Sequence, residues 1–236
     1  AQKGKGCLYR MGDVSAMISE KTQEPAPGAS QAAAGLPAKN SDVRKQGVTV
    51  PDKTFSDISS HKNQKAIEAL AAREIVNGKV GDKFMPDDTM TRAEFSTIIV
   101  KALGLVPKKN DKFSDVASGS WYAPYVGTAY SYGITNGTPE GKFNPGGTIT
   151  RQEAVVMVAR AAELAGMNMA IDAMTAKDVL SQFTDYITVS DWAKSSMALF
   201  YKEGILSQDD MEILPKAAIK RGEIAQMLCD MLKKAE

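Results

Sequence analysis

The chain has 236 residues, of which 43% are hydrophobic and 24% are charged, and its formal net charge is +1. This length allows one or two ordinary domains, and the balanced charge gives no broad basic surface of the kind that binds nucleic acid through its phosphates. The chain has one histidine and two cysteines, Cys7 and Cys229. These are too few for a zinc cluster or a disulfide framework, and they make a Ser-His-Asp catalytic triad improbable. We therefore expect no catalytic site, metal or cofactor, and a small buried thiol at Cys229. No run of about 18 apolar residues is present, so we expect no membrane insertion.

The first part of the chain predicts no domain of its own. Residues 1–24 have a weak helical spacing of apolar side chains and are too few to fold alone, so we expect them to be the remnant of an upstream domain. The chain also starts with Ala and lacks an apolar leader, which is typical of a fragment of a longer protein. Ala, Pro, Gly and Ser dominate the following stretch, which cannot bury enough surface to offset its ordering entropy. We predict a linker over residues 25–52.

The rest of the chain consists of three similar units, over residues 53–108, 109–166 and 167–236. Each unit has a Phe-x-Asp mark, an isoleucine-containing turn, an aromatic or aliphatic residue two positions before a proline, and an Arg-x-Glu mark. In chain order these motifs are Phe55 to Asp57, Phe113 to Asp115 and Phe183 to Asp185; Ile75 to Gly78, Ile134 to Gly137 and Ile205 to Gln208; Phe84 to Pro86, Phe143 to Pro145 and Ile213 to Pro215; and Thr91 to Glu94, Thr150 to Glu153 and Lys220 to Glu223. Four ordered marks that recur three times indicate tandem repeats.

Each repeat predicts two helices. In the second repeat, apolar residues recur at helical spacing from Tyr122 to Tyr130, and a further helix begins at Thr150, which can form a capping box with Glu153. Lys220 replaces the threonine in the third repeat, so that helix should begin more loosely. One helical hairpin cannot hide its own apolar face, so we predict an all-α fold in which three hairpins, about six main helices, share a core. A short additional helix is expected around Ala176 to Leu180.

The marks together resemble the S-layer homology domain, and the resemblance extends from about Phe55 to Lys234. It is nearly complete in the second repeat, at Phe113, Asp115, Trp121, Gly133, Ile134, Gly137, Phe143, Pro145, Ile149, Thr150, Arg151 and Glu153. The resemblance implies a monomer whose three repeats form a pseudo-threefold trimer. It also implies an extracellular location, at the cell wall or S-layer of a Gram-positive bacterium. There the repeats would anchor an exported protein by binding a secondary cell-wall polysaccharide, often with a pyruvylated and therefore anionic sugar, in grooves between repeats.

The chain departs from the pattern of this family at several positions. Lys62 lies where the tryptophan of the first repeat would fall, and Glu74 where a glycine would fall. The third repeat loses its threonine at Lys220 and its second glycine at Gln208. We therefore expect one or two working grooves, and expect the groove that depends mainly on the third repeat to be structural.

The arginines of the Arg-x-Glu marks are the leading candidates for glycan contact. An arginine at the first position of a helix lies beside unpaired amides and the positive end of the helix dipole, which both favour an anion. Indole rings can pack on sugar C–H faces, and carboxylates can accept hydrogen bonds from sugar hydroxyls. The candidate glycan-binding residues are Arg92, Arg151, Arg221, Trp121, Trp192, Asp57, Asp115, Asp185, Gly78, Gly137, Glu94 and Glu153.

Each candidate also has a purely structural interpretation. The arginines can form ion pairs on a solvated face, the tryptophans can belong to the core, and the aspartates and glycines can serve turns. A rival function is a protein–protein interaction module of the cell surface, because stacked helical hairpins offer surfaces to other helices or peptides.

Overall fold

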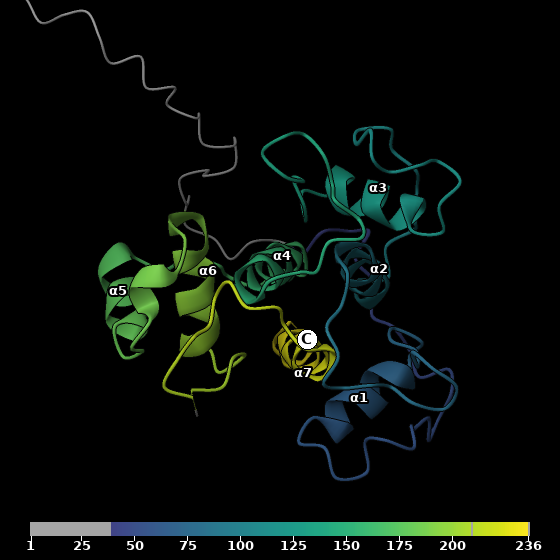
Figure 1. The fold of residues 1–236 in the computed structure, drawn as a ribbon, viewed down its shortest axis with the longest axis horizontal. Helices are drawn as coiled ribbons and strands as arrows, with labels where there is room; N and C mark the ends of the chain where they lie inside the picture. The colour runs from purple at the N-terminus through teal and green to yellow at the C-terminus, as the bar shows by residue number, and fades with distance from the viewer. Residues whose placement is uncertain (1–38, 209, 236) are drawn as a thin grey trace, which may run out of the picture. The chain divides into compact units, whose positions relative to one another are not determined.

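A computed structural model describes residues 39–208 and 210–235, and these contain seven α-helices and one short 3-10 helix (Figure 1). The helices are α1 (Gln64–Ala71), α2 (Arg92–Ala102), α3 (Ala123–Ser131), α4 (Arg151–Leu164), α5 (Ala173–Leu180), η1 (Tyr186–Thr188), α6 (Asp191–Lys202) and α7 (Arg221–Lys234). β-Pairing among these residues is limited to isolated bridges, so the all-α prediction is confirmed. The predicted upstream remnant, residues 1–24, and Cys7 lie outside the described residues.

Six of the helices follow one another as one pair in each repeat: α1 and α2, α3 and α4, and α6 and α7. The prediction that each pair forms a hairpin is wrong, because the two helices of a repeat pack mainly against other repeats. The additional helix that the sequence predicts is α5, which packs against α6 through the buried side chains of Ala176 and Leu180. No helix in the described part of the chain combines the length and the apolar character needed to cross a bilayer.

The second helices of the three repeats, α2, α4 and α7, lie side by side and are seen end-on in Figure 1. The first helices pack outside them, and each contacts the second helix of a different repeat: α3 lies against α2, α6 against α4, and α1 against α7. The repeats therefore share one apolar core, in which Phe95, Val158 and Leu228 of the three central helices are fully buried. No single repeat could bury its apolar faces alone.

Capping explains where the central helices begin. The Thr91 hydroxyl accepts from the Glu94 amide at 3.3 Å, while Glu94 Oε2 accepts from the Thr91 amide at 2.8 Å. The same box forms at the start of α4. At the start of α7, Glu223 still accepts from the Lys220 amide at 3.1 Å, but lysine offers no acceptor in return. The predicted difference between the helix starts is confirmed, and a full cap of this kind contributes about 1 kcal/mol.

Backbone hydrogen bonds connect the start of each central helix to a loop of another repeat. The Arg92 amide donates to the Gly147 carbonyl at 2.9 Å, and the Arg151 amide donates to the Ala217 carbonyl at 2.9 Å. The Arg221 amide donates to the Asp88 carbonyl at 2.8 Å, which returns from the third repeat to the first. Each helix start therefore directs its first side chain into a junction between two repeats.

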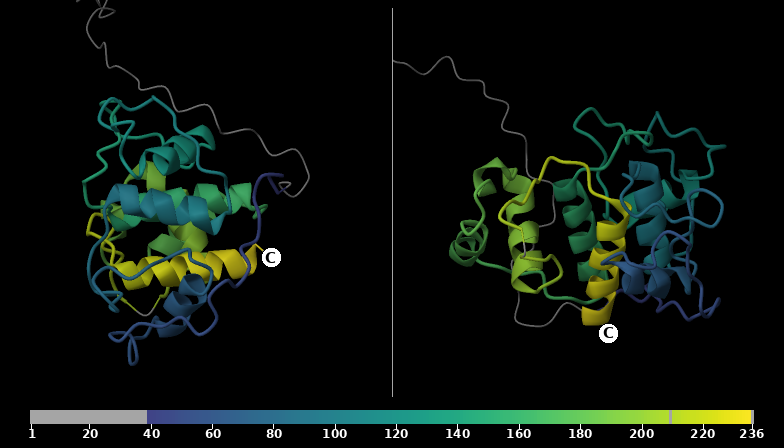
Figure 2. Two further views of the ribbon diagram at one scale, coloured as in Figure 1. Left: turned by 90° about the vertical axis from the view of Figure 1, so that its right-hand side faces the viewer. Right: turned by 60° about the horizontal axis from the view of Figure 1, so that its bottom comes forward.

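At the opposite end of the central helices, residues 39–50, here called the strap, cross the helix ends (Figure 2, left). The Asn40 amide donates to the Leu164 carbonyl and the Arg44 amide to the Leu103 carbonyl, both at 2.9 Å. These bonds satisfy carbonyls that a helix C-terminus leaves without an internal partner. The strap belongs to the stretch predicted as a linker. Composition alone could not reveal its path, because its partners lie far away in the sequence.

Candidate functional site

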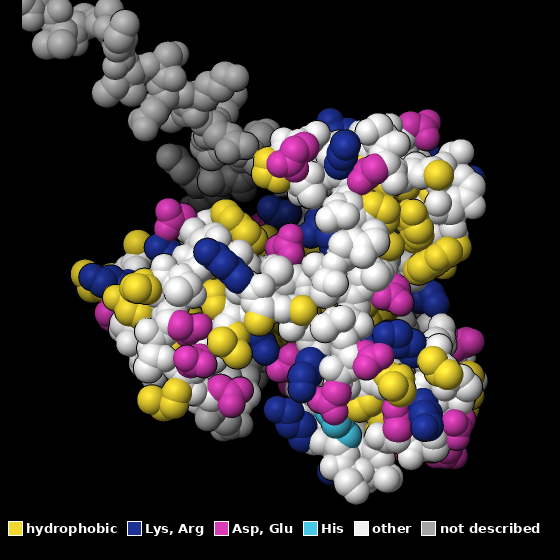
Figure 3. All heavy atoms as spheres, viewed as in Figure 1, with side chains coloured by type: hydrophobic (Ala, Val, Ile, Leu, Met, Phe, Trp, Pro, Cys, Tyr) yellow, Lys and Arg dark blue, Asp and Glu magenta, His cyan; other side chains and the backbone are white. Residues whose placement is uncertain are grey.

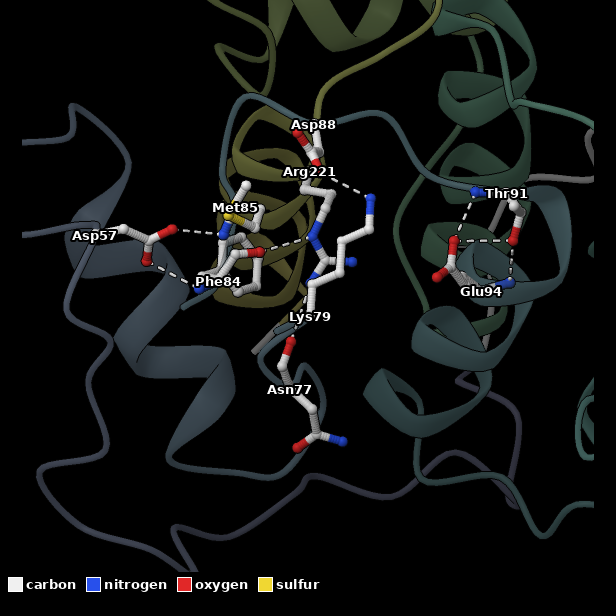
Figure 4. A network of polar contacts seen from close by, with 9 residues as sticks. All are labelled: Asp57, Asn77, Lys79, Phe84, Met85, Asp88, Thr91, Glu94 and Arg221. Carbon is white, nitrogen blue, oxygen red and sulfur yellow. Dashed lines mark hydrogen bonds and ion pairs between the residues drawn. The ribbon is translucent and has the colours of Figure 1, made fainter. Parts of the chain in front are cut away.

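The Phe-x-Asp aspartates hold the loops that the three arginines meet. Asp57 accepts from the Phe84 amide at 2.8 Å and from the Met85 amide at 2.7 Å (Figure 4). Asp115 and Asp185 bind the equivalent amides of their own repeats. Burial alone would raise the pKa of Asp57 and Asp115, but the two backbone donors outweigh it, so the pKa of each lies below its usual value. Both oxygens of each carboxylate are therefore already engaged within the fold, and their predicted contact with sugar stays a prediction.

The arginine of the third repeat is buried against the first. Its Nε donates to the Phe84 carbonyl at 2.9 Å, and its Nη2 donates to the Asn77 carbonyl at 3.0 Å (Figure 4). The guanidinium carbon lies 4.5 Å from the centre of the Phe84 ring. Arg221 is thus buried, at 5% exposure, between two carbonyls and an aromatic face.

Arg92 is enclosed in the same way at the junction of the first and second repeats. Its Nε donates to the Phe143 carbonyl at 2.9 Å, and its Nη1 forms an ion pair with Glu153 Oε1 at 2.6 Å. Glu153 also serves the cap of α4, so both of its oxygens have partners inside the protein. Arg92 therefore has the ion pair of its structural interpretation, but the pair is internal, with the arginine side chain 7% exposed, and does not lie on a solvated face.

Arg151, at the junction of the second and third repeats, differs from both. Its Nη2 pairs with Glu223 Oε1 at 2.8 Å, and its side chain is 18% exposed. Its Nε is buried without any hydrogen-bond partner. The carbonyl that would correspond to those of Phe84 and Phe143 belongs to Ile213, and no hydrogen bond joins it to the Arg151 Nε. A buried donor of this kind costs about 1 to 3 kcal/mol until it finds an acceptor.

A cavity of about 580 Å³, here called the Arg151 cavity, opens at this junction. Most of its walls come from the third repeat, while Lys62 and Asn63 come from the first repeat and Arg151 from the second. The lining residues that carry polar side chains are Lys62, Asn63, Arg151, Thr184, Tyr201, Ser207, Asp210, Glu212, Lys220, Glu223 and Gln226. Figure 3 looks onto the end at which the central helices begin and shows a hollow between the surface over α6 and the surface over α1, with charges of both signs at its rim.

The charges of the Arg151 cavity are balanced, with three cationic and three anionic side chains among its lining residues. Burial alone would raise the pKa of Glu223, but Arg151 outweighs it, so the pKa lies below its usual value and Glu223 stays ionised at neutral pH. Lys220 is paired with Asp87 at 2.8 Å. Burial raises the pKa of Tyr201 to about 12, which keeps its hydroxyl protonated as a neutral donor.

Two residues of the third repeat that lie next to lining residues of the Arg151 cavity, Gln208 and Ile213, differ from their counterparts in the other repeats. At Gly137, an added Cβ would meet the Phe113 ring at 2.4 Å, so the glycine allows the ring to cover the turn. Gln208 occupies the equivalent place in the third repeat and donates instead to the Tyr201 carbonyl at 3.1 Å. Ile213 also replaces a phenylalanine: at the other two junctions Phe143 packs against Arg92, and Phe84 packs against Arg221. The sequence predicted that the groove depending mainly on the third repeat is structural, and no observation of the structure tests this role.

The structure does not bring the remaining candidates into the Arg151 cavity. Trp121 and Trp192 are 61% and 56% exposed, so neither belongs to the core, and neither lines the cavity. Glu94 is engaged in the cap of α2. The close approach of Phe55 and the Lys83 carbonyl explains the glycine at Gly78.

Sequence reasoning missed Tyr201 and Lys62 as site residues. Tyr201 follows the apolar spacing of α6 and could not be told from a core residue. Lys62 had a signal, since it is the departure from tryptophan in the first repeat, but its proximity to Arg151 depends on α1 packing against the third repeat.

Comparison with known proteins identifies the three repeats. The model of the S-layer homology domain matches residues 54–96, 112–155 and 182–225, which together are more than half of the chain. The chain is 34% identical over 204 residues, 85% of its length, to "Exoglucanase XynX" of Acetivibrio thermocellus. It is 29% identical over 175 residues, 72% of its length, to "Surface-layer 125 kDa protein" of Lysinibacillus sphaericus. It is also 29% identical over 170 residues, 68% of its length, to "Cellulosome-anchoring protein" of Acetivibrio thermocellus.

These matches cover 18%, 14% and 36% of the three relatives, so the similarity concerns a module of much longer proteins. The relatives differ in name, and the shared part is the set of repeats. The chain belongs to the S-layer homology domain family and contains three tandem domains of this family within residues 54–225, which serve to anchor proteins at the cell surface and cell wall.

Proposed function

We propose that the chain fastens a larger exported protein to the cell wall without a covalent bond, by holding an acidic sugar of a secondary wall polysaccharide in the Arg151 cavity. The observation that carries this proposal is the contrast among the three arginines. Arg92 and Arg221 are each buried against a carbonyl and a phenylalanine ring, whereas Arg151 lines an open cavity and its side chain is 18% exposed. The ring of backbone bonds that runs from the first repeat to the third and back supports a pseudo-threefold arrangement, and the open junction is where that arrangement departs from symmetry.

The cavity has the size and the donors that this ligand needs. Its volume of about 580 Å³ lies within the range of small-ligand sites, roughly 300 to 1,000 Å³. Glu223 occupies Nη2 of Arg151, which leaves Nη1 of the partly exposed guanidinium for a carboxylate such as that of a pyruvate ketal. Lys62 supplies a second cation, and Asp210 and Glu212 can accept from sugar hydroxyls. The proposal assigns binding to these residues and no reaction.

The proposal is tested by measuring the binding of the chain to purified wall polysaccharide. Arg151→Gln removes the charge-assisted hydrogen bonds and should weaken binding by about 10- to 100-fold. Lys202→Gln removes an exposed charge from α6 outside the cavity, and this matched control should bind like the unchanged chain. Equal affinity of Arg151→Gln and the control would contradict the proposal.

A second measurement separates the glycan from a protein partner. Cell walls are offered to the chain before and after chemical removal of the polysaccharide. The proposal expects binding to disappear with the glycan. Binding that survives glycan removal would favour the protein–protein interaction module.

A further inference from the structure

The ring of Tyr201 is held firmly in the wall of the Arg151 cavity. Tyr201 is 4% exposed and is one of the lining residues of that cavity. Its ring packs against the ring of Phe183, with 4.4 Å between the two ring centres. Its carbonyl accepts from the Gly204 amide and from Gln208 Nε2, both at 3.1 Å, at the end of α6. Packing and backbone bonds therefore give the side chain a defined position.

The hydroxyl of Tyr201 has no hydrogen-bond partner within the described part of the chain. The described side-chain atoms that are completely buried without a partner are Ser96 Oγ and Arg151 Nε. The Tyr201 hydroxyl is not one of them, so it is reached from the cavity. Burial raises its pKa to about 12, and the charges of Arg151, Asp210 and Glu223 also act on that pKa. The hydroxyl therefore lies close to these three lining residues and keeps its proton at neutral pH.

The first two repeats offer no equivalent hydroxyl to the Arg151 cavity. Tyr201 lies three positions before Gly204, and the equivalent residues are Ala71 in the first repeat and Tyr130 in the second. Alanine has no hydroxyl. Tyr130 is half-buried and outside the lining of the cavity, with its ring 5.3 Å from the ring of Phe113. Tyr130 therefore provides a matched control for Tyr201.

A carboxylate bound at Arg151 needs a second donor. It has two oxygens that accept hydrogen bonds, and Arg151 has Nη1 for one of them, because Nη2 is paired with Glu223. Glu223 is itself an anion, so the second donor must also offset the repulsion between two carboxylates. Lys62 is exposed on a long flexible stem, whereas the Tyr201 hydroxyl is fixed in the wall. A hydrogen bond to an ionised acceptor is roughly twice as strong as one between neutral groups.

We infer that the Tyr201 hydroxyl donates to one carboxylate oxygen of the acidic sugar while Arg151 holds the other, which makes Tyr201 a residue that determines the specificity of the cavity for the acid. The inference rests on the proposed function, because it concerns the same bound sugar. Donation to a sugar hydroxyl instead would strengthen the binding of acidic and neutral saccharides alike, so the two cases differ in a binding experiment.

The test is a calorimetric titration of the complete 236-residue chain with wall polysaccharide, in its acidic form and after removal of the acid groups. Tyr201→Phe removes the hydroxyl and keeps the ring. We expect it to weaken the binding of the acidic form by at least about tenfold and to leave the binding of the neutral form unchanged. Tyr130→Phe makes the same change at the equivalent position and should bind both forms like the unchanged chain.

Urea unfolding shows whether the hydroxyl serves the fold. Because it has no partner within the described part of the chain, Tyr201→Phe should keep the unfolding midpoint of the unchanged chain. Tyr132 is the opposite case, because its hydroxyl donates to Asp42 Oδ2 at 2.7 Å outside the Arg151 cavity. Tyr132→Phe should therefore lower the midpoint and leave the preference for the acidic form unchanged.

The inference is overturned if Tyr201→Phe binds the acidic form like the unchanged chain or weakens both forms equally. It is also overturned if Tyr201→Phe lowers the urea midpoint without changing the preference for the acid, or if Tyr130→Phe weakens binding to the same extent. Arg151→Gln distinguishes this failure from that of the proposed function. Weak binding by Arg151→Gln with normal binding by Tyr201→Phe contradicts the inference alone, whereas normal binding by Arg151→Gln contradicts both.

Discussion

Replacing Arg92 with alanine should mainly lower the stability of the fold, whereas replacing Arg151 with alanine should mainly weaken glycan binding. Arg92→Ala deletes a hydrogen bond to the Phe143 carbonyl, an ion pair with Glu153 and a contact with the Phe143 ring. A hydrogen bond made by a charged group contributes about 1.5 to 3 kcal/mol, and a ring contact of this kind about 0.5 to 1 kcal/mol. Glu153 is 32% exposed, so water compensates part of the loss, and the lower end of each range applies. We expect a destabilisation of about 3.5 kcal/mol.

Arg151→Ala should cost much less stability. It deletes one ion pair between partly exposed side chains, worth about 1 kcal/mol, and it also removes a buried donor that has no partner. Urea unfolding followed by circular dichroism measures both variants. With an m-value of about 3 kcal/mol/M, the midpoint should fall by about 1 M for Arg92→Ala and by about 0.3 M or less for Arg151→Ala.

Glycan binding, measured in buffer without denaturant, should rank the two variants the other way round. Arg151→Ala should lose glycan binding, and Arg92→Ala should retain it. Arg221→Ala is the matched variant for the second enclosed arginine. It should be destabilised to a similar extent, because it loses two hydrogen bonds from a charged group to carbonyls and a contact with the Phe84 ring. Equal midpoints for Arg92→Ala and Arg151→Ala would refute the assignment of structural and binding roles to the two junctions.

Further predictions concern the turns and acidic conditions. Gly137→Ala should lower the melting temperature markedly, because φ is +80° there and the added Cβ would lie 2.5 Å from the Lys142 carbonyl. The control Gly146→Ala adds a methyl group in open space and should leave the melting temperature nearly unchanged. Acidification should destabilise the fold, because the folded-state pKa of Asp57 and Glu223 lies below the unfolded values of 3.8 and 4.5. The unfolded chain then binds more protons, so stability present above those values is lost as pH falls through the folded pKa values. Unfolding midpoints that do not decrease below about pH 4 would contradict this linkage.

Much of the fold could be predicted from the sequence because its signals are local. The capping boxes at Thr91 and Thr150, the loose start at Lys220 and the additional helix before Leu180 follow from residues that interact within a few positions. The pairing of each first helix with the second helix of another repeat could not be predicted, because no local pattern distinguishes one apolar helix face from another. The path of the strap could not be predicted either, because the amide of Asn40 donates to the carbonyl of Leu164, which lies far away in the sequence.

The candidate site was predicted less well, because three arginines with the same local pattern have different surroundings. What separates them is the residue that each meets across a junction, which is Phe143 for Arg92, Phe84 for Arg221 and the loop of Ile213 for Arg151. The absence of a phenylalanine at Ile213 was visible in the sequence. Its effect on the surroundings of Arg151 could not be predicted without knowing which repeats contact one another.

Calorimetric titration of the chain with wall polysaccharide, in its acidic form and after removal of the acid groups, tests the central claim most directly. The account predicts one saccharide end bound per chain and an acidic form that binds at least about tenfold more tightly, since one arginine donor set is open. Two or three equivalents per chain, or equal affinity for the two forms, would contradict it.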